Sequence, residues 1–212
     1  MSPTNFAQQE RAALCDLFEE IGPDQPTLCE GWTTRDLAAH LVVRERRPDA
    51  ALGIIAAPFE RHSEKVRLAT AEQPWRRLVA LVRSGPPKLS LFGPPPIDRA
   101  ANTMEYFIHH EDARRGQEGW EPRQLDPELS DEIWKSVRRM SKMMMRKAPA
   151  GITLAVPGGE PVVAHAGDPM VEITAPAGEL ALFSYGRQHD TRIQIDGPAD
   201  AVEQVLDASF GI

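Results

Sequence analysis

Two side chains that bind metal ions well lie one helical turn apart on one predicted helix. Glu105 and His109 are four residues apart, which places them about 40° apart around the helix. His110 lies about 140° from Glu105 and cannot readily join them. His40, on an earlier predicted helix, is the natural third ligand, because metal sites in bundles are assembled from facing helices. Two imidazoles and one carboxylate leave a coordination position open, as in a catalytic zinc site or a non-haem iron or nickel site.

The same pair has a plainer interpretation, because a glutamate and a histidine at this spacing often form a solvated pair on a helix surface. Spacing alone favours this second interpretation. If the residues do hold an ion, it would lower the pKa of a bound thiol or water, and would keep a thiolate or hydroxide available near neutral pH.

Two aspartates stand where they could orient the histidine rings. Asp36 precedes His40 by four residues, and Asp112 follows His109 by three, so either carboxylate could accept a hydrogen bond from the second ring nitrogen. Asp36 also fits a different role. It stands three residues after Thr33, in the position of a capping box at the start of a helix.

Three arginines are candidates for receiving an anionic group of a thiol or substrate. Arg44 lies one turn after His40, Arg47 follows at the predicted helix end, and Arg187 lies near the C-terminus. Arg44 and Arg47 also fit a solvated helix end, where cations complement the helix dipole.

The composition is that of an ordinary globular protein. The chain has 212 residues, 42% of them hydrophobic, and a net charge of -7, without the basic excess that would favour nucleic acid. No apolar run approaches the roughly 20 residues needed to cross a bilayer, and the N-terminus lacks a signal-peptide pattern, so we expect a cytoplasmic protein. Cys15 and Cys29 form no C-x-x-C motif. We therefore expect a metal site of histidines and carboxylates, with Cys15 buried and Cys29 partly exposed.

Apolar residues recur at helical spacing in the first 149 residues. After these residues the pattern changes to short runs rich in β-branched residues, separated by Gly and Pro, which is typical of strands and turns. We therefore predict a helical bundle over residues 1–149 and a small α+β domain over residues 150–212. The predicted helices are 5–21, 33–47, 60–83 with a break at Pro74, 97–116 and 127–147, followed by strands near 151–156, 161–166, 170–174 and 192–196 and helices after Pro176 and Pro198.

Two stretches resemble the mycothiol-dependent maleylpyruvate isomerase family, within the DinB-like metal-binding four-helix bundles. Residues 28–41 contain the family's Trp-Thr-x-x-Asp-x-x-x-His pattern in full, and residues 105–109 with Asp112 are similar to its later Glu-x-x-x-His pair. Residues 176–187 are less specifically similar to its smaller C-terminal domain. The resemblance implies a mainly α fold with a DinB-like bundle, and a metal-ligand role for His40, Glu105 and His109.

The resemblance also implies a function. Family members of this build use a divalent ion, usually taken as zinc, to bind the thiolate of a low-molecular-weight thiol. We therefore expect a metal-binding protein, with zinc first and nickel or iron as alternatives, that acts as a thiol-dependent isomerase or transferase on a small electrophile. Mycothiol is the candidate thiol. The alternative is a non-catalytic metal-binding or regulatory protein, and nothing in the sequence identifies the substrate.

Overall fold

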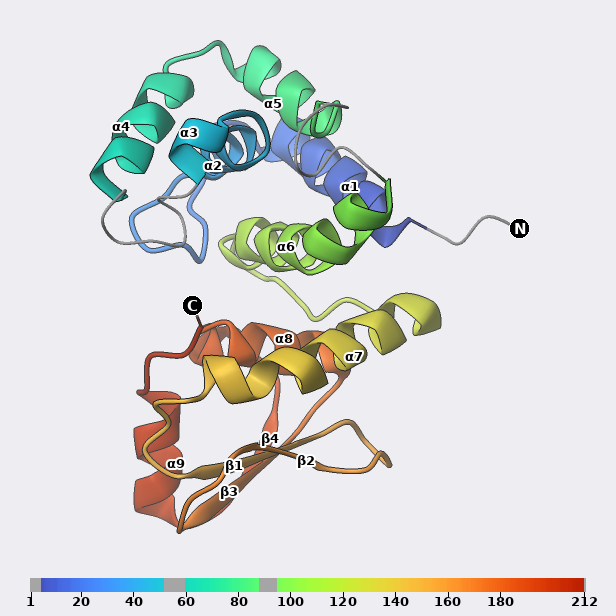
Figure 1. Cartoon of the computed structure of the whole chain (residues 1–212), viewed down its shortest axis with the longest axis vertical. Helices are drawn as coiled ribbons and strands as arrows, with labels where there is room; N and C mark the ends of the chain where they lie inside the picture. The colour runs from blue at the N-terminus through green and yellow to red at the C-terminus, as the bar shows by residue number, and fades with distance from the viewer. Residues whose placement is uncertain (1–4, 52–59, 88–94, 212) are drawn as a thin grey trace. The chain divides into compact units, whose positions relative to one another are not determined.

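A computed structural model describes residues 5–51, 60–87 and 95–211. Its internal contacts divide the chain into two compact units, Met1–Trp120 and Glu121–Ile212, and each is described by itself (Figure 1). The first unit is helical. Its described helices are α1 (Phe6–Ile21), α2 (Thr34–Arg46), α3 (Pro48–Ala51), α4 (Glu60–Ala71), α5 (Trp75–Arg83) and α6 (Pro95–Arg115).

The helix boundaries follow local signals in the sequence. Asn5 caps α1, because its side chain accepts a hydrogen bond from the Gln8 backbone N–H. The break predicted at Pro74 separates α4 from α5. Helix α6 begins at Pro95, two residues earlier than predicted. The predicted connection between the helices 60–83 and 97–116 falls largely on residues 88–94, outside the described residues.

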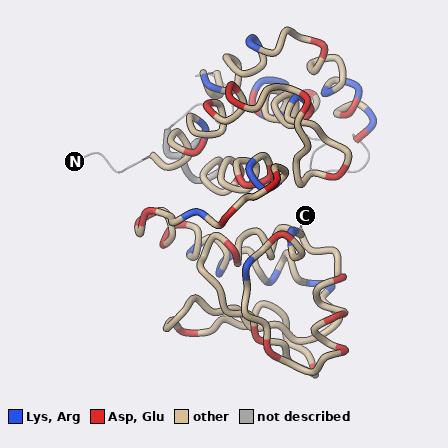
Figure 2. Tube along the Cα trace, turned by 180° about the vertical axis from the view of Figure 1, so that it is seen from behind, with Lys and Arg blue, Asp and Glu red and all other residues tan. Residues whose placement is uncertain are grey.

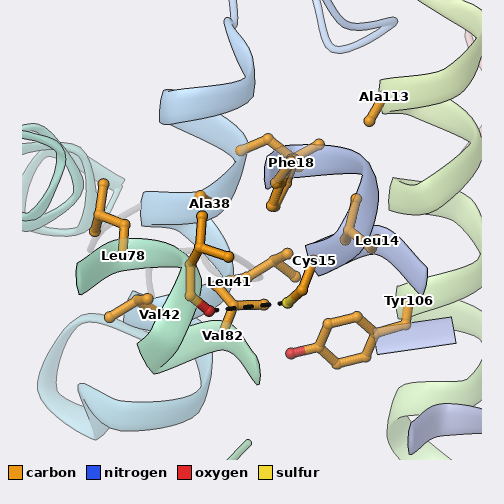
Figure 3. Close-up of a cluster of buried hydrophobic side chains, with 12 residues drawn as sticks. Leu14, Cys15, Phe18, Ala38, Leu41, Val42, Leu78, Val82, Tyr106 and Ala113 are labelled. Carbon is orange, nitrogen blue, oxygen red and sulfur yellow. Dashed lines mark hydrogen bonds between the residues drawn. The ribbon is translucent and has the colours of Figure 1, made fainter. Parts of the chain in front are cut away.

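The core of the first unit is built from one apolar stripe on each of four helices (Figure 3). Residues four apart on a helix share a face, as Leu14 and Phe18 do on α1 and Leu78 and Val82 do on α5, and all four are buried. The buried members are Leu14, Cys15, Phe18, Leu37, Ala38, Leu41, Val42, Leu78, Val79, Val82, Tyr106 and Ala113. This shared core holds α2 and α6 in one body, and these two helices carry the predicted metal ligands.

The second unit combines a small sheet with helices. Its strands are β1 (Gly151–Ala155), β2 (Val162–His165), β3 (Met170–Thr174) and β4 (Gln194–Asp196), in the order β2-β1-β3-β4. Strands β1 and β3 are parallel and the outer pairs are antiparallel. The helices are α7 (Pro127–Met144), α8 (Ala177–Ser184) and α9 (Ala199–Leu206), with a short 3-10 turn at Gln188–Asp190 that the sequence did not predict. The predicted strands and helices of this region are otherwise confirmed.

Helix α7 belongs with the second unit. It buries Leu129, Ile133 and Val137 and packs against α8 and β2 (Figure 1). The predicted domain boundary near residue 150 follows the change from helical to strand-like sequence, whereas the division by contacts comes one helix earlier. The residue pattern does not reveal this difference, because an amphipathic helix has the same pattern whichever unit its apolar face packs against.

Charged residues of both signs are interspersed along the described chain (Figure 2). Some of them are buried in pairs, as Arg11 and Glu45 are, with 2.7 Å between Nη2 and Oε1. A helix long and apolar enough to span a membrane is absent from the described residues.

Candidate metal centre

The start of α2 determines where His40 stands. Thr33 Oγ1 accepts a hydrogen bond from the Asp36 backbone N–H at 3.4 Å, and the Asp36 carboxylate accepts one from the Thr33 N–H at 3.0 Å. This capping box, predicted from the sequence, satisfies two N–H groups that a helix start otherwise leaves without partners. His40 follows one turn later, and its side chain is only 11% exposed.

His40, Glu105 and His109 meet between α2 and α6. Glu105 Oε1 lies 3.5 Å from His40 Nε2 and 3.4 Å from His109 Nε2. One ligand atom from each residue lies within 4.8 Å of the others. The two imidazole rings stand nearly perpendicular, with centroids 5.2 Å apart. The structure therefore brings together the three side chains that the sequence singled out.

Glu105 is held in its ionised form. Burial alone would raise its pKa, but hydrogen bonds from His109 and His40 and the positive charges of His109 and Arg44 place it well below its usual range. Arg44 Nε lies 3.0 Å from Glu105 Oε1, and the Arg44 guanidinium also donates to the side-chain oxygen of Asn102. Arg44, predicted as a binder of anions, therefore contacts a carboxylate of the site itself.

The two histidines of the cluster differ in protonation. Burial lowers the pKa of His40, and its hydrogen bond to Glu105 only partly opposes this effect. Burial would also lower the pKa of His109, but hydrogen bonds to Asp112, Cys29 and Glu105 outweigh it and hold that pKa well above its usual range. The neutral form is therefore favoured for His40 and the protonated form for His109, so an ion that binds His109 competes with a proton.

The second ring nitrogen of His109 faces the other way. Its Nδ1 lies 2.9 Å from Asp112 Oδ2, and the Asp112 side chain is fully buried. This is the arrangement expected of a carboxylate that orients a ligating histidine. The Cys29 thiol donates to the same Oδ2 at 3.2 Å, and its sulfur lies 4.0 Å from His109 Nδ1.

Asp36 is engaged elsewhere. Besides its capping contacts with Thr33, its carboxylate forms an ion pair with Arg67 of α4. The Arg67 guanidinium also lies over the Trp32 ring, 4.8 Å from its centroid. Trp32 in turn contacts the His40 ring at a centroid distance of 5.2 Å. Asp36 therefore supports the helix start and its packing against α4, and Trp32 covers one side of His40.

The other two predicted arginines have local partners. Arg47 is about half exposed and forms an ion pair with Asp49 at 2.8 Å, and His62 contacts the same carboxylate. Arg187 lies in the second unit, where its guanidinium donates to the Tyr185 carbonyl.

A buried network adjoins the cluster. Glu45 Oε1 accepts hydrogen bonds from Arg11 at 2.7 Å, from the Tyr106 hydroxyl at 2.9 Å and from the Asn102 amide at 3.4 Å. Since Asn102 also accepts from Arg44, this network reaches the arginine that contacts Glu105. Sequence reasoning missed it, because its members lie on three helices at no recognisable spacing.

Sequence reasoning also did not place Cys29 at the site. The expectation of a metal site made only of histidines and carboxylates rested on the lack of a C-x-x-C motif, yet the Cys29 sulfur, His109 Nδ1 and an Asp112 oxygen lie within 4.8 Å of one another. The exposure of the two cysteines is as predicted, with Cys15 buried and Cys29 half-buried.

Comparison with known proteins identifies the family. Residues 7–114 match the family model of the mycothiol maleylpyruvate isomerase N-terminal domain, and that range includes all three clustered residues. The chain belongs to this family. Its maleylpyruvate isomerase relationship, suggested by the Trp-Thr-x-x-Asp-x-x-x-His pattern, is therefore confirmed.

A solved structure shows the same fold. The chain is similar to the mycothiol-dependent maleylpyruvate isomerase, seen in a crystal structure of a point mutant, with a TM-score of 0.63, 14% sequence identity and 90% of each chain covered. At this identity the likeness concerns the fold, and it confirms the mainly helical, DinB-like architecture with a small sheet. No match is found among curated proteins.

Proposed function

We propose that this member of the maleylpyruvate isomerase family is a divalent-metal-dependent enzyme that uses a low-molecular-weight thiol, mycothiol or a close analogue, on a small electrophilic molecule. The reaction is an isomerisation or a transfer of the thiol. The observation that carries the proposal is that ligand atoms of His40, Glu105 and His109 lie within 4.8 Å of one another in a chain of this family. The cytoplasm suits this chemistry, because thiols are kept reduced there.

The donor set fits a divalent ion. Two imidazole nitrogens and one carboxylate oxygen suit zinc, with nickel or iron as alternatives, and three protein ligands leave room for an external one. The three side chains are 11%, 22% and 13% exposed, so the cluster is largely shielded from water without being sealed. A bound divalent ion would supply a thiol or water of lowered pKa at this position.

The surrounding residues prepare the cluster. Arg44 and the two imidazoles keep Glu105 anionic, while burial keeps His40 neutral and its lone pair available. Asp112 orients the His109 ring through Nδ1, so that Nε2 faces Glu105. We keep Arg44, Arg47 and Arg187 as candidates for binding anionic groups of the thiol or the substrate. Arg44 is the one that contacts the cluster.

Metal stoichiometry tests the first half of the proposal. Protein purified without chelator or affinity metal should contain about one divalent ion per chain by elemental analysis, and His40→Ala and His109→Ala should lose it. His62→Ala is the matched control, because His62 is half exposed and contacts Asp49 rather than the cluster. Equal metal content in all four proteins, or none in the wild type after reconstitution, would refute the site.

A thiol titration tests the second half. In cobalt-substituted protein, mycothiol should change the d-d absorption of the ion, and the His62→Ala variant should respond like the wild type. A protein that binds cobalt at this site but shows no response to any low-molecular-weight thiol would favour the alternative of a non-catalytic metal-binding protein.

A further inference from the structure

A second group of potential ligands lies on the far side of the His109 ring. It consists of the Cys29 sulfur, an Asp112 carboxylate oxygen and His109 Nδ1. The separations are 2.9 Å between Nδ1 and Oδ2, 3.2 Å between sulfur and Oδ2, and 4.0 Å between sulfur and Nδ1. A tetrahedral zinc ion, with bonds of about 2.0–2.3 Å, spaces its ligands about 3.3–3.8 Å apart. Movements of well under 1 Å would therefore let these three atoms share one ion.

The loop that carries Cys29 is tied to α6 by its backbone. The Leu28 N–H donates to the Asp112 carbonyl at 3.0 Å, and the Cys29 N–H donates to Thr27 Oγ1 at 3.2 Å. Gly116 permits this contact, because a Cβ at that position would collide with the carbonyl of Pro26. These contacts hold the backbone of Cys29 next to Asp112 and His109 of α6, so the fold itself brings the thiol close to the carboxylate.

We propose that Cys29, Asp112 and Nδ1 of His109 form a second cation site, suited to a thiophilic divalent ion such as Cd²⁺. A thiolate is a soft ligand and the first cluster has none, so the two groups differ in the ions they prefer. Binding replaces the thiol proton and the Nδ1 proton by the ion and releases both protons to solvent. Sulfur is neither oxidised nor reduced.

The two sites compete because they share one ring. A neutral imidazole offers one lone pair and carries one N–H, so His109 serves an ion at Nε2 or at Nδ1, but not both unless the ring loses its second proton. The second site rests on the proposed function only through this shared residue. It requires neither mycothiol nor catalytic activity.

Cadmium titration of the metal-free full-length chain tests the proposal. A thiolate bound to Cd²⁺ absorbs in the ultraviolet by charge transfer, and we expect this absorption in the wild type and in His40→Ala. Cys29→Ser should lose it and bind Cd²⁺ at least about tenfold more weakly, a difference of about 1.4 kcal/mol. Cys15→Ser is the matched control and should keep it, because Cys15 is buried in the core and contacts the Val79 carbonyl.

The outcomes separate this proposal from the previous one. No charge-transfer absorption in the wild type, or its persistence in Cys29→Ser, would overturn the second site. Its loss in His40→Ala would also overturn it, because Cys29 would then be a ligand of the first ion. Zinc stoichiometry measured on Cys29→Ser shows whether that variant is folded and retains the first site. Loss of zinc from His40→Ala tests the proposed metal centre independently of cadmium.

Discussion

Replacing Asp112 by asparagine should weaken zinc binding by an amount that depends on pH. The substitution keeps the shape of a fully buried side chain but removes the charge that faces His109 Nδ1 at 2.9 Å. Loss of a carboxylate that orients a ligating histidine costs about tenfold to hundredfold in metal affinity, which is about 1.4–2.7 kcal/mol. That range is similar to the roughly 1.5–3 kcal/mol typical of a hydrogen bond to a charged group.

A second effect opposes the first at low pH. Burial would lower the pKa of His109, and the hydrogen bond to Asp112 is the strongest of the contacts that raise it. Asp112→Asn should therefore lower this pKa. A smaller fraction of His109 is then protonated, so the proton competes less strongly with the ion. At a pH high enough that neither protein keeps the competing proton on His109, well above the usual titration range of histidine, the variant should show the full loss. Towards about pH 6 the protonated wild-type His109 binds the ion more weakly, and the two affinities should converge.

Competition with a chromophoric zinc chelator, repeated across this pH range, measures both affinities. Asp131→Asn is the control, because Asp131 is an exposed carboxylate of α7 in the second unit. Equal affinity of Asp112→Asn and wild type at a pH where neither protein keeps the competing proton on His109 would refute the orienting role of Asp112. A ratio of affinities that stays constant with pH would refute the argument that Asp112 holds the proton on His109.

Three further outcomes follow from described contacts. Thr33→Ala removes the cap of α2 and should lower the free energy of unfolding in urea by about 1 kcal/mol; loss of zinc stoichiometry as well would show that the cap does more than start the helix. A thiol reagent should label Cys29 quickly and Cys15 slowly, because burial raises the pKa of Cys15 to about 12, and equal labelling rates followed by mass spectrometry would contradict this. Tyr106→Phe removes one hydrogen bond from the buried Glu45 carboxylate and should destabilise the chain by about 1–3 kcal/mol, and an unchanged urea midpoint would contradict it.

Local signals predicted the helices and two of the three clustered residues. The Thr33 cap, the Pro74 break and the apolar stripes act within a few residues, so the sequence shows them directly. The pairing of Glu105 with His109 follows from helical geometry alone. The third candidate ligand, His40, required that two helices face each other, which the sequence indicated only through the general architecture of bundles and the family pattern.

Contacts between segments distant in sequence account for what was missed. Asp36 has two compatible roles by spacing, and only the position of Arg67 on another helix shows which contacts its carboxylate makes. Cys29 approaches Asp112 because its loop hydrogen-bonds to α6, and no periodicity of the sequence encodes that approach. Arg44 stands one turn after His40 in the sequence, but its contact with Glu105 depends on the packing of α2 near α6.

The loop that carries Cys29 and helix α6 are far apart along the chain, so they are synthesised at different times. Cys29 and Asp112 are 83 residues apart, and at about 5–20 residues per second a ribosome needs about 4–17 s to make the intervening chain. During that interval the nascent protein carries His40 and Cys29 without their partners on α6. Metal capture at either proposed site would therefore be a late event, after the first helices have been synthesised, and a nascent chain arrested before Glu105 should bind no ion at this position.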